Sequence, residues 1–293
     1  MPTESVPTRD FEHPNPANML VFNANDPCGA GGLAADVLAA ACVGVHAMPV
    51  MTGAFSRDTA QIFDFFPLDD EAVMEQARAI LEDIAVSCFQ LGFAGTPDNL
   101  GVVAGLSADY EDVPLIAYMP DLSWWTNDAI DTYHDAFVEL ILPQTTLLTG
   151  NYATLKRWLL PHWHSDRLPG ARDIAIAAGK LGARYTLVTG IDVAERGIEN
   201  TLATPQSVLT SVKVQRLENT YTGAGDTLSA TLGALLANGC DLVDAVTEAL
   251  KYLEGSLIGG FRPGMGHTLP DRLFWAQPQQ PAYDSVADVS LSL

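Results

Sequence analysis

The sequence predicts an α/β protein built on a largely parallel sheet. Short apolar runs of strand length alternate with longer amphipathic segments of helix length, which is the pattern of βα units. A glycine cluster follows the first apolar run, where such a unit turns from strand to helix. The chain has 293 residues, of which 48% are hydrophobic, and no long linker divides it, so we expect one main domain.

The short apolar runs are predicted to form buried strands. In chain order, these strands are Met19–Asn23, Val45–Met51, Val86–Gly92, Leu115–Met119, Leu147–Leu148 and Tyr185–Thr189. The segment Asp192–Arg216 holds two further strand-like stretches, and we expect it to form a hairpin at the edge of the sheet.

The longer segments between the strands are predicted to form helices. They are Gly32–Cys42, Asp69–Asp83, Pro97–Ala108, Ala153–Leu159, Ala171–Leu181, Ala224–Asn238 and Leu242–Leu257. The acidic pair Asp69-Asp70 is interpreted as a helix start. Both ends of the chain are expected to be peripheral, with a flexible segment at 1–18, a main domain at 19–276 and a C-terminal tail or partner-docking strand at 277–293.

The charge balance restricts the classes of partner. Fifteen Lys and Arg residues against 36 Asp and Glu give a formal net charge of −21. Such a surface repels phosphate backbones and anionic membranes, so we expect neither nucleic-acid nor membrane binding. A small anionic ligand is still compatible, because backbone N–H groups at a helix start can hold a phosphate.

The cysteines and the N-terminal residues indicate a cytoplasmic protein. Cys28, Cys42, Cys88 and Cys240 lie far apart and form no CxxC pair, which favours reduced thiols. Residues 1–18 lack the basic start and apolar core of a signal peptide. No apolar run approaches the ~20 residues that a membrane span needs.

Two glycine clusters, each just ahead of a predicted helix, are the candidate sites. The first is NANDPCGAGGLAAD (Asn23–Asp36), and the second is TGAGDT (Thr222–Thr227). Neither fits GxGxxG or the Lys-containing phosphate loop, so an ordinary dinucleotide fold or P-loop is disfavoured.

The second cluster has the groups that phosphoryl transfer needs. Small residues at Gly223, Ala224 and Gly225 let successive N–H groups converge on an anion, and the helix dipole adds positive charge there. Asp226 could then accept the proton of an attacking hydroxyl. The alternative is that Thr222 or Asp226 only caps the helix.

Several stretches carry a family resemblance. TGAGDTLSA at 222–230 resembles the signature of the ribokinase-like superfamily of small-molecule kinases. Five further stretches resemble motifs of the hydroxymethylpyrimidine/phosphomethylpyrimidine kinases and the related pyridoxal kinases. They are the first glycine cluster, the stretch GVHAMPVMTGAFSRDT at 44–59, QLGFAG at 90–95, LLTGN at 147–151 and RPGMG at 262–266. Their order holds from Met19 to Trp275. The resemblance implies a three-layer α/β/α sandwich with a mainly parallel central sheet, and ATP with Mg²⁺ as the phosphate donor.

The resemblance also implies roles for individual residues, which fall into three groups. Asp226 would be the general base, with Gly223, Ala224 and Gly225 as the anion hole; Asp26, Gly31, His46 and Arg57 would lie on the substrate side; Asn151, Thr189, Gly190 and Thr222 would lie on the nucleotide side. No residue is assigned to the metal.

Four departures from the family pattern bear on the substrate or on the metal. Asp226 stands where the pyrimidine kinases commonly have Cys, and Thr189 replaces a Lys; both features resemble pyridoxal kinases. Arg57 replaces a Gln that pairs with the pyrimidine ring, and it has no acceptor. Thr154 stands where the family has an acid that helps to hold Mg²⁺.

Other candidates are given structural interpretations. His46 lies among apolar residues, which favours a hydrogen-bonded pocket or core residue over a metal ligand. Tyr118 and Trp124-Trp125 could stack an aromatic ring, but packing or a subunit interface is favoured. The His pair of PHWH (161–164) is too short a motif to indicate a metal site.

The resulting hypothesis is an ATP-dependent kinase acting on the hydroxymethyl group of a small heteroaromatic alcohol. Hydroxymethylpyrimidine or its phosphate is the first choice, and pyridoxal or pyridoxine is the alternative. Two non-kinase hypotheses remain open: a sensor that binds the vitamin precursor without catalysis, and an oligomeric scaffold. A homodimer is expected.

Overall fold

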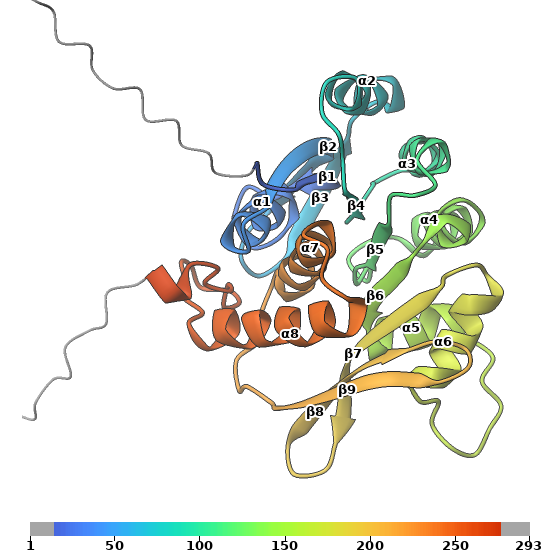
Figure 1. Ribbon diagram of the computed structural model, residues 1–293. Helices are drawn as coiled ribbons and strands as arrows, with labels where there is room; N and C mark the ends of the chain where they lie inside the picture. The colour runs from blue at the N-terminus through green and yellow to red at the C-terminus, as the bar shows by residue number, and fades with distance from the viewer. Residues whose placement is uncertain (1–14, 277–293) are drawn as a thin grey trace, which may run out of the picture.

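The computed structural model describes residues 15–276, and these residues form one nine-stranded sheet (Figure 1). The strand order across the sheet is β3-β2-β1-β4-β5-β6-β7-β8-β9. The strands are β1 (Asn18–Asn25), β2 (His46–Arg57), β3 (Ile62–Pro67), β4 (Cys88–Leu91), β5 (Leu115–Met119), β6 (Leu147–Asn151), β7 (Tyr185–Val193), β8 (Gly197–Ala203) and β9 (Val208–Gln215).

The central strands, from β2 across to β7, run parallel, and the strands outside them are antiparallel. In the centre, β1 pairs in parallel with β2 and β4, so that Met19 faces Ala47 on one side and Cys88 on the other. At one edge β3 folds back on β2, and at the other β7, β8 and β9 form an antiparallel meander. The predicted parallel sheet and the predicted edge hairpin are therefore both confirmed.

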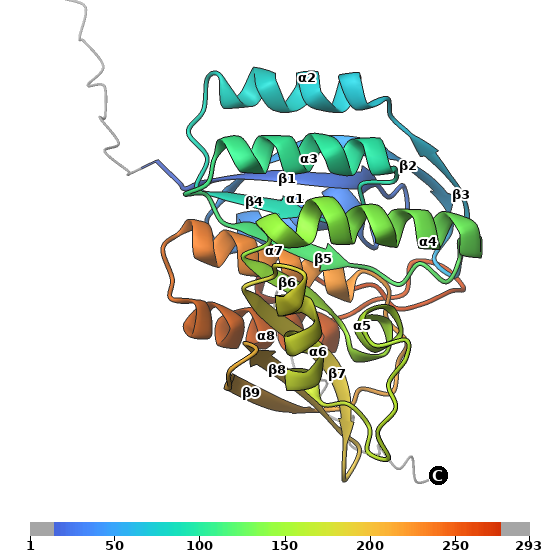
Figure 2. The ribbon, with the colours of Figure 1, turned by 90° about the vertical axis from the view of Figure 1, so that its right-hand side faces the viewer.

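Helices cover both faces of the sheet, which makes a three-layer sandwich (Figures 1 and 2). On one face, α1 (Gly32–Cys42), α7 (Ala224–Ala237) and α8 (Leu242–Ile258) pack side by side. The other face carries α2 (Asp70–Leu81), α3 (Pro97–Asp109), α4 (Asn127–Ala136), α5 (Tyr152–Leu159) and α6 (Ala171–Lys180). Short turns of π- and 3₁₀-helix follow α4 at Phe137–Ile141 and Leu142–Gln144, and a 3₁₀ turn lies at Phe274–Ala276.

Each face of the sheet has its own apolar core, because successive side chains of a strand point to opposite sides. In β1, Leu20 and Phe22 join the core beneath α2 to α6, whereas Met19 and Val21 join the core beneath α1, α7 and α8. All four side chains are buried. A central strand buried on both faces needs a nearly continuous apolar sequence, and this is why β1 could be predicted from the chain.

Local signals in the sequence set several helix starts. Thr96 caps α3 by accepting a hydrogen bond from the Asn99 N–H at 3.1 Å, and Pro97 fills the first turn, where no N–H is needed. Asp69 caps α2 by accepting from the Glu71 N–H at 3.0 Å, which confirms the predicted helix start.

Two elements were not predicted from the sequence. Strand β3 has no buried face, because all six of its residues are exposed or only partly buried, and it owes its conformation to pairing with β2. Helix α4 is largely polar, and Tyr133 is its one buried residue. Since neither element carries a clear apolar period, only the tertiary structure defines them.

The predicted tail at 277–293 and most of the predicted N-terminal segment at 1–18 lie outside the described residues, so the domain limits remain a prediction. Within residues 15–276, no helix combines the length and the apolar character needed to cross a membrane.

Candidate active site

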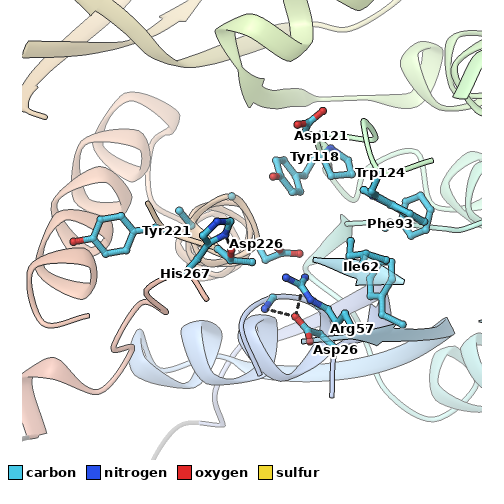
Figure 3. A pocket seen from close by; sticks show the side chains of 18 of the residues that line it. Asp26, Arg57, Ile62, Phe93, Tyr118, Asp121, Trp124, Tyr221, Asp226 and His267 are labelled. Carbon is cyan, nitrogen blue, oxygen red and sulfur yellow. Dashed lines mark hydrogen bonds and ion pairs between the residues drawn. The ribbon is translucent and has the colours of Figure 1, made fainter. Parts of the chain in front are cut away.

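A cleft of about 740 Å³ opens at the carboxyl ends of the parallel strands. Its lining includes residues at or after the ends of β1, β4, β5 and β6, Thr189 within β7, the β2–β3 hairpin and the start of α7. In open parallel sheets, ligands bind at this end of the strands. Figure 3 shows Asp226 near the centre of the cleft, with Tyr118 on one side and Arg57 with Asp26 on the other.

The two glycine clusters meet in this cleft. A Cβ atom added at Gly31 would lie only 2.6 Å from Asp226 Oδ2. Gly223 has a φ of +90°, and a Cβ added there would lie 1.5 Å from the Ala30 carbonyl oxygen. Only glycine satisfies both conditions at Gly223, so its place in the sequence is explained by the close approach of the first loop.

Asp226 does not cap its own helix. Gly223 is the N-cap residue of α7 and makes no side-chain cap, and the Thr222 hydroxyl is bonded instead to His267 Nδ1 at 2.9 Å. Asp226 Oδ1 accepts a hydrogen bond from Asn23 Nδ2 at 3.0 Å. The alternative in which Thr222 or Asp226 serves as a helix cap is therefore wrong.

Asn23 is held rigidly at the end of β1. Its Oδ1 accepts from the N–H groups of Ala24 at 2.8 Å and Phe93 at 2.9 Å. Its Nδ2 donates to Asp36 Oδ2 at 2.7 Å as well as to Asp226. The two backbone donors fix which end of the amide is oxygen, so Nδ2 is the shared donor that links two carboxyl groups.

Burial weakens the acidity of both carboxyl groups. Burial raises the pKa of Asp226 above its usual range, while the Asn23 amide, the Gly32 N–H and the Arg272 charge act in the opposite direction. The pKa of Asp36 is raised well above its usual range, first by burial and then by the neighbouring Asp226 charge. These shifts make Asp36 the weaker acid of the pair and increase the basicity of the Asp226 carboxylate.

The start of α7 forms the turn that the sequence predicts to bind an anion. Gly223, Ala224 and Gly225 all line the cleft at the N-terminus of a 14-residue helix. Free N–H groups and the helix dipole favour an anion at such a place. The Tyr118 hydroxyl packs against this turn, since a Cβ added at Gly225 would lie 2.0 Å from it.

Asp26 and Arg57 form a buried ion pair on the opposite wall of the cleft. Arg57 Nη1 lies 3.3 Å from Asp26 Oδ2, and the two side chains are 9% and 1% exposed. Asp26 also accepts from the N–H groups of Cys28 and Gly31, both at 2.9 Å. These bonds occupy the carboxylate and fix the first glycine loop, which leaves Arg57 to present donors to the cleft.

Aromatic side chains build a third wall. Phe55 and Phe93 stack with ring centroids 5.6 Å apart, and Trp124 packs edge-on against both at 5.7 and 5.8 Å. All three line the cleft, and Trp124 also stacks on Trp125. The packing predicted for the Trp pair is thus observed, and Trp124 in addition faces the cleft (Figure 3).

Three of the four predicted nucleotide-side residues come from different elements: Asn151 ends β6, Thr189 lies within β7 and Thr222 precedes α7. Asn151, Thr189 and Thr222 line the cleft. Gly190 packs closely against the Asn151 side chain, because a Cβ added at Gly190 would lie 2.5 Å from Asn151 Nδ2. Thr189 donates to the Gly150 carbonyl at 3.2 Å, which ties β7 to β6 at this point.

The structure changes the interpretation of one histidine, His46. His46 begins β2 at the amino end of the strand, is exposed, and does not line the cleft, so its predicted place in the substrate pocket is wrong. The two ends of a strand lie at opposite ends of the sheet, so His46 is far from the carboxyl end where the cleft opens. Sequence spacing alone did not show at which end of the strand His46 lies. His162 and His164 stack on each other at 6.5 Å. Across residues 15–276, no group of three or more His, Cys, Asp or Glu side chains is arranged to hold a metal.

Several residues that line or support the cleft carried no predicted role, among them the polar residues Asn23, Asp36, Asp121, His267 and Arg272. For Asn23 a signal was available, since a polar residue closing a buried strand points to the carboxyl edge of the sheet. The others come from separate elements, and only folding brings them together.

Comparisons with known proteins identify the family of this chain. The family model described as phosphomethylpyrimidine kinase matches residues 26–271. A hydroxymethylpyrimidine/phosphomethylpyrimidine kinase of Streptomyces coelicolor is 27% identical over 254 residues, covering 86% of this chain and 92% of the relative.

Solved structures show the same fold. The ADP complex of Bacillus subtilis pyridoxal kinase superposes with a TM-score of 0.79 at 20% identity, covering 89% of this chain and 99% of that one. The Staphylococcus aureus pyridoxal kinase bound to AMP-PCP and pyridoxal gives 0.78 at 17% identity, covering 89% and 95%. The ribokinase-like sandwich implied by the motifs is thereby confirmed, and this chain belongs to the phosphomethylpyrimidine kinase family of ribokinase-like enzymes.

Proposed function

We propose that this chain transfers the γ-phosphoryl group of ATP to the hydroxymethyl group of a small heteroaromatic alcohol. The observation that carries the proposal is the meeting of the two glycine clusters, which brings the first glycine loop at Ala30–Gly31 against the Gly223–Asp226 turn in one cleft. A hydroxyl bound in the cleft would face its base and an anion-binding turn at the same time.

The chemistry follows from these two groups. Asp226 takes the proton of the substrate hydroxyl while the hydroxyl oxygen of the substrate forms a bond to the γ-phosphorus. The bond between that phosphorus and the oxygen bridging to the β-phosphate breaks, and ADP leaves with the electron pair. The N–H groups at Gly223–Gly225 stabilise the negative charge on the moving phosphoryl group.

ATP with Mg²⁺ is the phosphate donor in this proposal. A bound Mg²⁺ usually keeps several waters and takes one or two carboxylates plus the substrate phosphates. Asp121 offers such a carboxylate, since it lines the cleft and its side chain is 59% exposed. Thr154 is buried in α5 and does not line the cleft. Mg²⁺ held in this way would neutralise phosphate charge during transfer.

Hydroxymethylpyrimidine or its phosphate is the substrate that the family assignment favours. The matching family and the Streptomyces coelicolor relative carry that name. The aromatic wall of Phe55, Phe93 and Trp124 suits a flat heteroaromatic ring.

Pyridoxal or pyridoxine is the second candidate, and Arg57 favours it. Arg57 offers only hydrogen-bond donors to the cleft. The Asp26 carboxylate already interacts with three donors, which are the Arg57 guanidinium and the N–H groups of Cys28 and Gly31. A ring whose acceptor faces Arg57 is accommodated, whereas an amino group in that place meets another donor.

The test offers each alcohol with Mg·ATP to the purified chain and follows ADP release. We expect turnover of at least one of hydroxymethylpyrimidine, its phosphate, pyridoxal and pyridoxine. Turnover of none of them would remove all of these substrate assignments. The sensor hypothesis predicts instead that these alcohols bind to the wild type and to Asp226→Asn without ADP formation. The scaffold hypothesis predicts no thermal shift with ATP or with any of the alcohols.

We further propose a homodimer in the cytoplasm. Phe63 and Phe66 lie on the edge strand β3 and are 59% and 58% exposed, which supports contact with a second copy. Cys28, Cys42, Cys88 and Cys240 are free thiols, which suits a reducing compartment. Light scattering tests the dimer, and fractionation of the source cells tests the location.

A further inference from the structure

Arg272 lies behind the active-site cleft and is 5% exposed. It comes from the segment after α8, far in sequence from either glycine cluster. Its own carbonyl oxygen accepts hydrogen bonds from Tyr252 Oη at 2.7 Å and Cys42 Sγ at 3.0 Å. The backbone of Arg272 is therefore anchored by α8 and α1, which fixes where its side chain can reach.

The guanidinium joins the two glycine clusters directly. On the first cluster, it donates to the carbonyl oxygens of Gly29, at 3.2 Å, and Ala30. On the second, its Nε donates to Thr227 Oγ1 at 3.0 Å and its Nη2 lies 3.5 Å from the Gly223 carbonyl oxygen. A planar fork with five donors can serve two loops at once, which a lysine ammonium cannot do with the same geometry.

This crosslink lies beside the anion-binding turn. The Gly223 carbonyl belongs to the same peptide unit as the N–H of Ala224, a residue that lines the cleft. A cationic donor on that carbonyl polarises the peptide and strengthens its N–H as a donor. Thr227 is itself bonded to the Gly223 carbonyl at 2.7 Å, so the guanidinium, Thr227 and Gly223 form one connected network.

The charge of Arg272 also acts on the site. Several groups surround the Asp226 carboxylate: Asp26 from the first loop, Asp36 from α1, Tyr118 from β5 and Arg272. Arg57 is paired with Asp26. Arg272 is therefore the cation that favours the ionised form of Asp226, and it lowers the pKa of this carboxyl group against the effect of burial.

We propose that Arg272 is a positioning residue for phosphoryl transfer: it clamps the Gly29–Ala30 loop onto the Gly223–Thr227 turn and holds the base and the anion-binding amides in register. Arg272 does not itself line the cleft. The inference rests on the proposed kinase activity, which turnover by the wild-type enzyme tests separately.

The experiment compares Arg272→Gln and Arg272→Lys with wild type by steady-state kinetics across pH, using the alcohol that the wild type phosphorylates. In Arg272→Gln, we expect kcat to fall by roughly 10–100-fold, because the two loops lose their register. We also expect the acidic limb of kcat/KM to move to higher pH by roughly one unit, because Asp226 loses its cation. Arg272→Lys should keep the wild-type position of that limb but recover only part of kcat.

Arg78→Gln is the matched control, since Arg78 is exposed on α2 and distant from the cleft. It should leave both kcat and the pH profile unchanged. Thermal melting of every variant shows which are folded at the assay temperature.

A role confined to stability would lower the melting temperature without moving the acidic limb in the folded enzyme. The proposal is overturned if Arg272→Gln keeps the wild-type limb, or if Arg272→Lys equals the wild type in kcat. Failure of both variants to fold also overturns it, because Arg272 would then act on the whole fold. Absence of turnover in the wild type would instead reject the proposed function.

Discussion

Asn23 Nδ2 lies 3.0 Å from Asp226 Oδ1, although the two residues are 203 positions apart in the chain. The contact joins the end of β1 to the first turn of α7, and it ties the carboxylate to the first glycine cluster. Because the same nitrogen also bonds Asp36, the orientation of Asp226 depends on a small network of buried polar groups that spans three elements of the fold.

The first prediction concerns Asp226 as the general base. Asp226→Asn should lower kcat by roughly 10²–10⁴-fold, because the amide cannot accept the hydroxyl proton. The shape of the side chain and its place beside Gly31 are preserved, so the affinity for the alcohol should change little. ADP release and calorimetric binding measure the two quantities. Wild-type turnover in Asp226→Asn would rule out the role.

The second prediction concerns the close approach of Gly31 to the base. Gly31→Ala should lower kcat by roughly 10–100-fold, since the new Cβ would lie 2.6 Å from Asp226 Oδ2 and displace it. Gly101→Ala is the control, because a Cβ there meets no atom within 4 Å and sits inside α3. The control should keep full activity and gain roughly 0.5–1 kcal/mol of stability. Equal activity in both variants contradicts the geometry.

The third prediction concerns substrate choice at Arg57. Arg57→Gln replaces a donor-only side chain with one that also accepts, so the kcat/KM of hydroxymethylpyrimidine relative to pyridoxal should rise by roughly tenfold. Competition between the two alcohols in one reaction measures the ratio directly. Arg78→Gln on the α2 surface should leave it unchanged. An unaltered ratio in Arg57→Gln would show that this side chain does not read the ring.

The fourth prediction concerns the buried Asp36. Its pKa is higher in the folded than in the unfolded chain, so its contribution to stability is full at low pH and is lost as pH rises through the folded pKa. That loss amounts to at most about 1.4 kcal/mol per pH unit. Asp36→Asn cannot ionise, so the stability advantage of the wild type over this variant should shrink from pH 5 to pH 8.

Urea unfolding at both pH values measures this difference. Asp109→Asn, on the exposed surface of α3, is the control. The difference in unfolding free energy between the wild type and this variant should be small and nearly the same at both pH values. A wild-type advantage over Asp36→Asn that stays constant or grows with pH would show that Asp36 is ionised in the fold.

The sequence by itself determined the fold class, the core strands and the chemistry of the α7 start. Buried parallel strands such as β1 require nearly continuous apolar sequences. A turn that is closely approached by the backbone of another segment requires glycine. Both requirements can be recognised in the sequence. The resemblance of TGAGDTLSA then pointed to Asp226 and the anion-binding turn, both of which lie in the cleft.

The tertiary structure alone decided which residues support that turn and which do not. His46 and Arg57 lie on the same strand, yet β2 places them at opposite ends, and only Arg57 lines the cleft. Strand β3 and helix α4 bury too few residues to produce a recognisable apolar pattern in the sequence. Asp36 and Arg272 act through contacts between distant segments, and such contacts leave no local period or spacing from which they could be predicted.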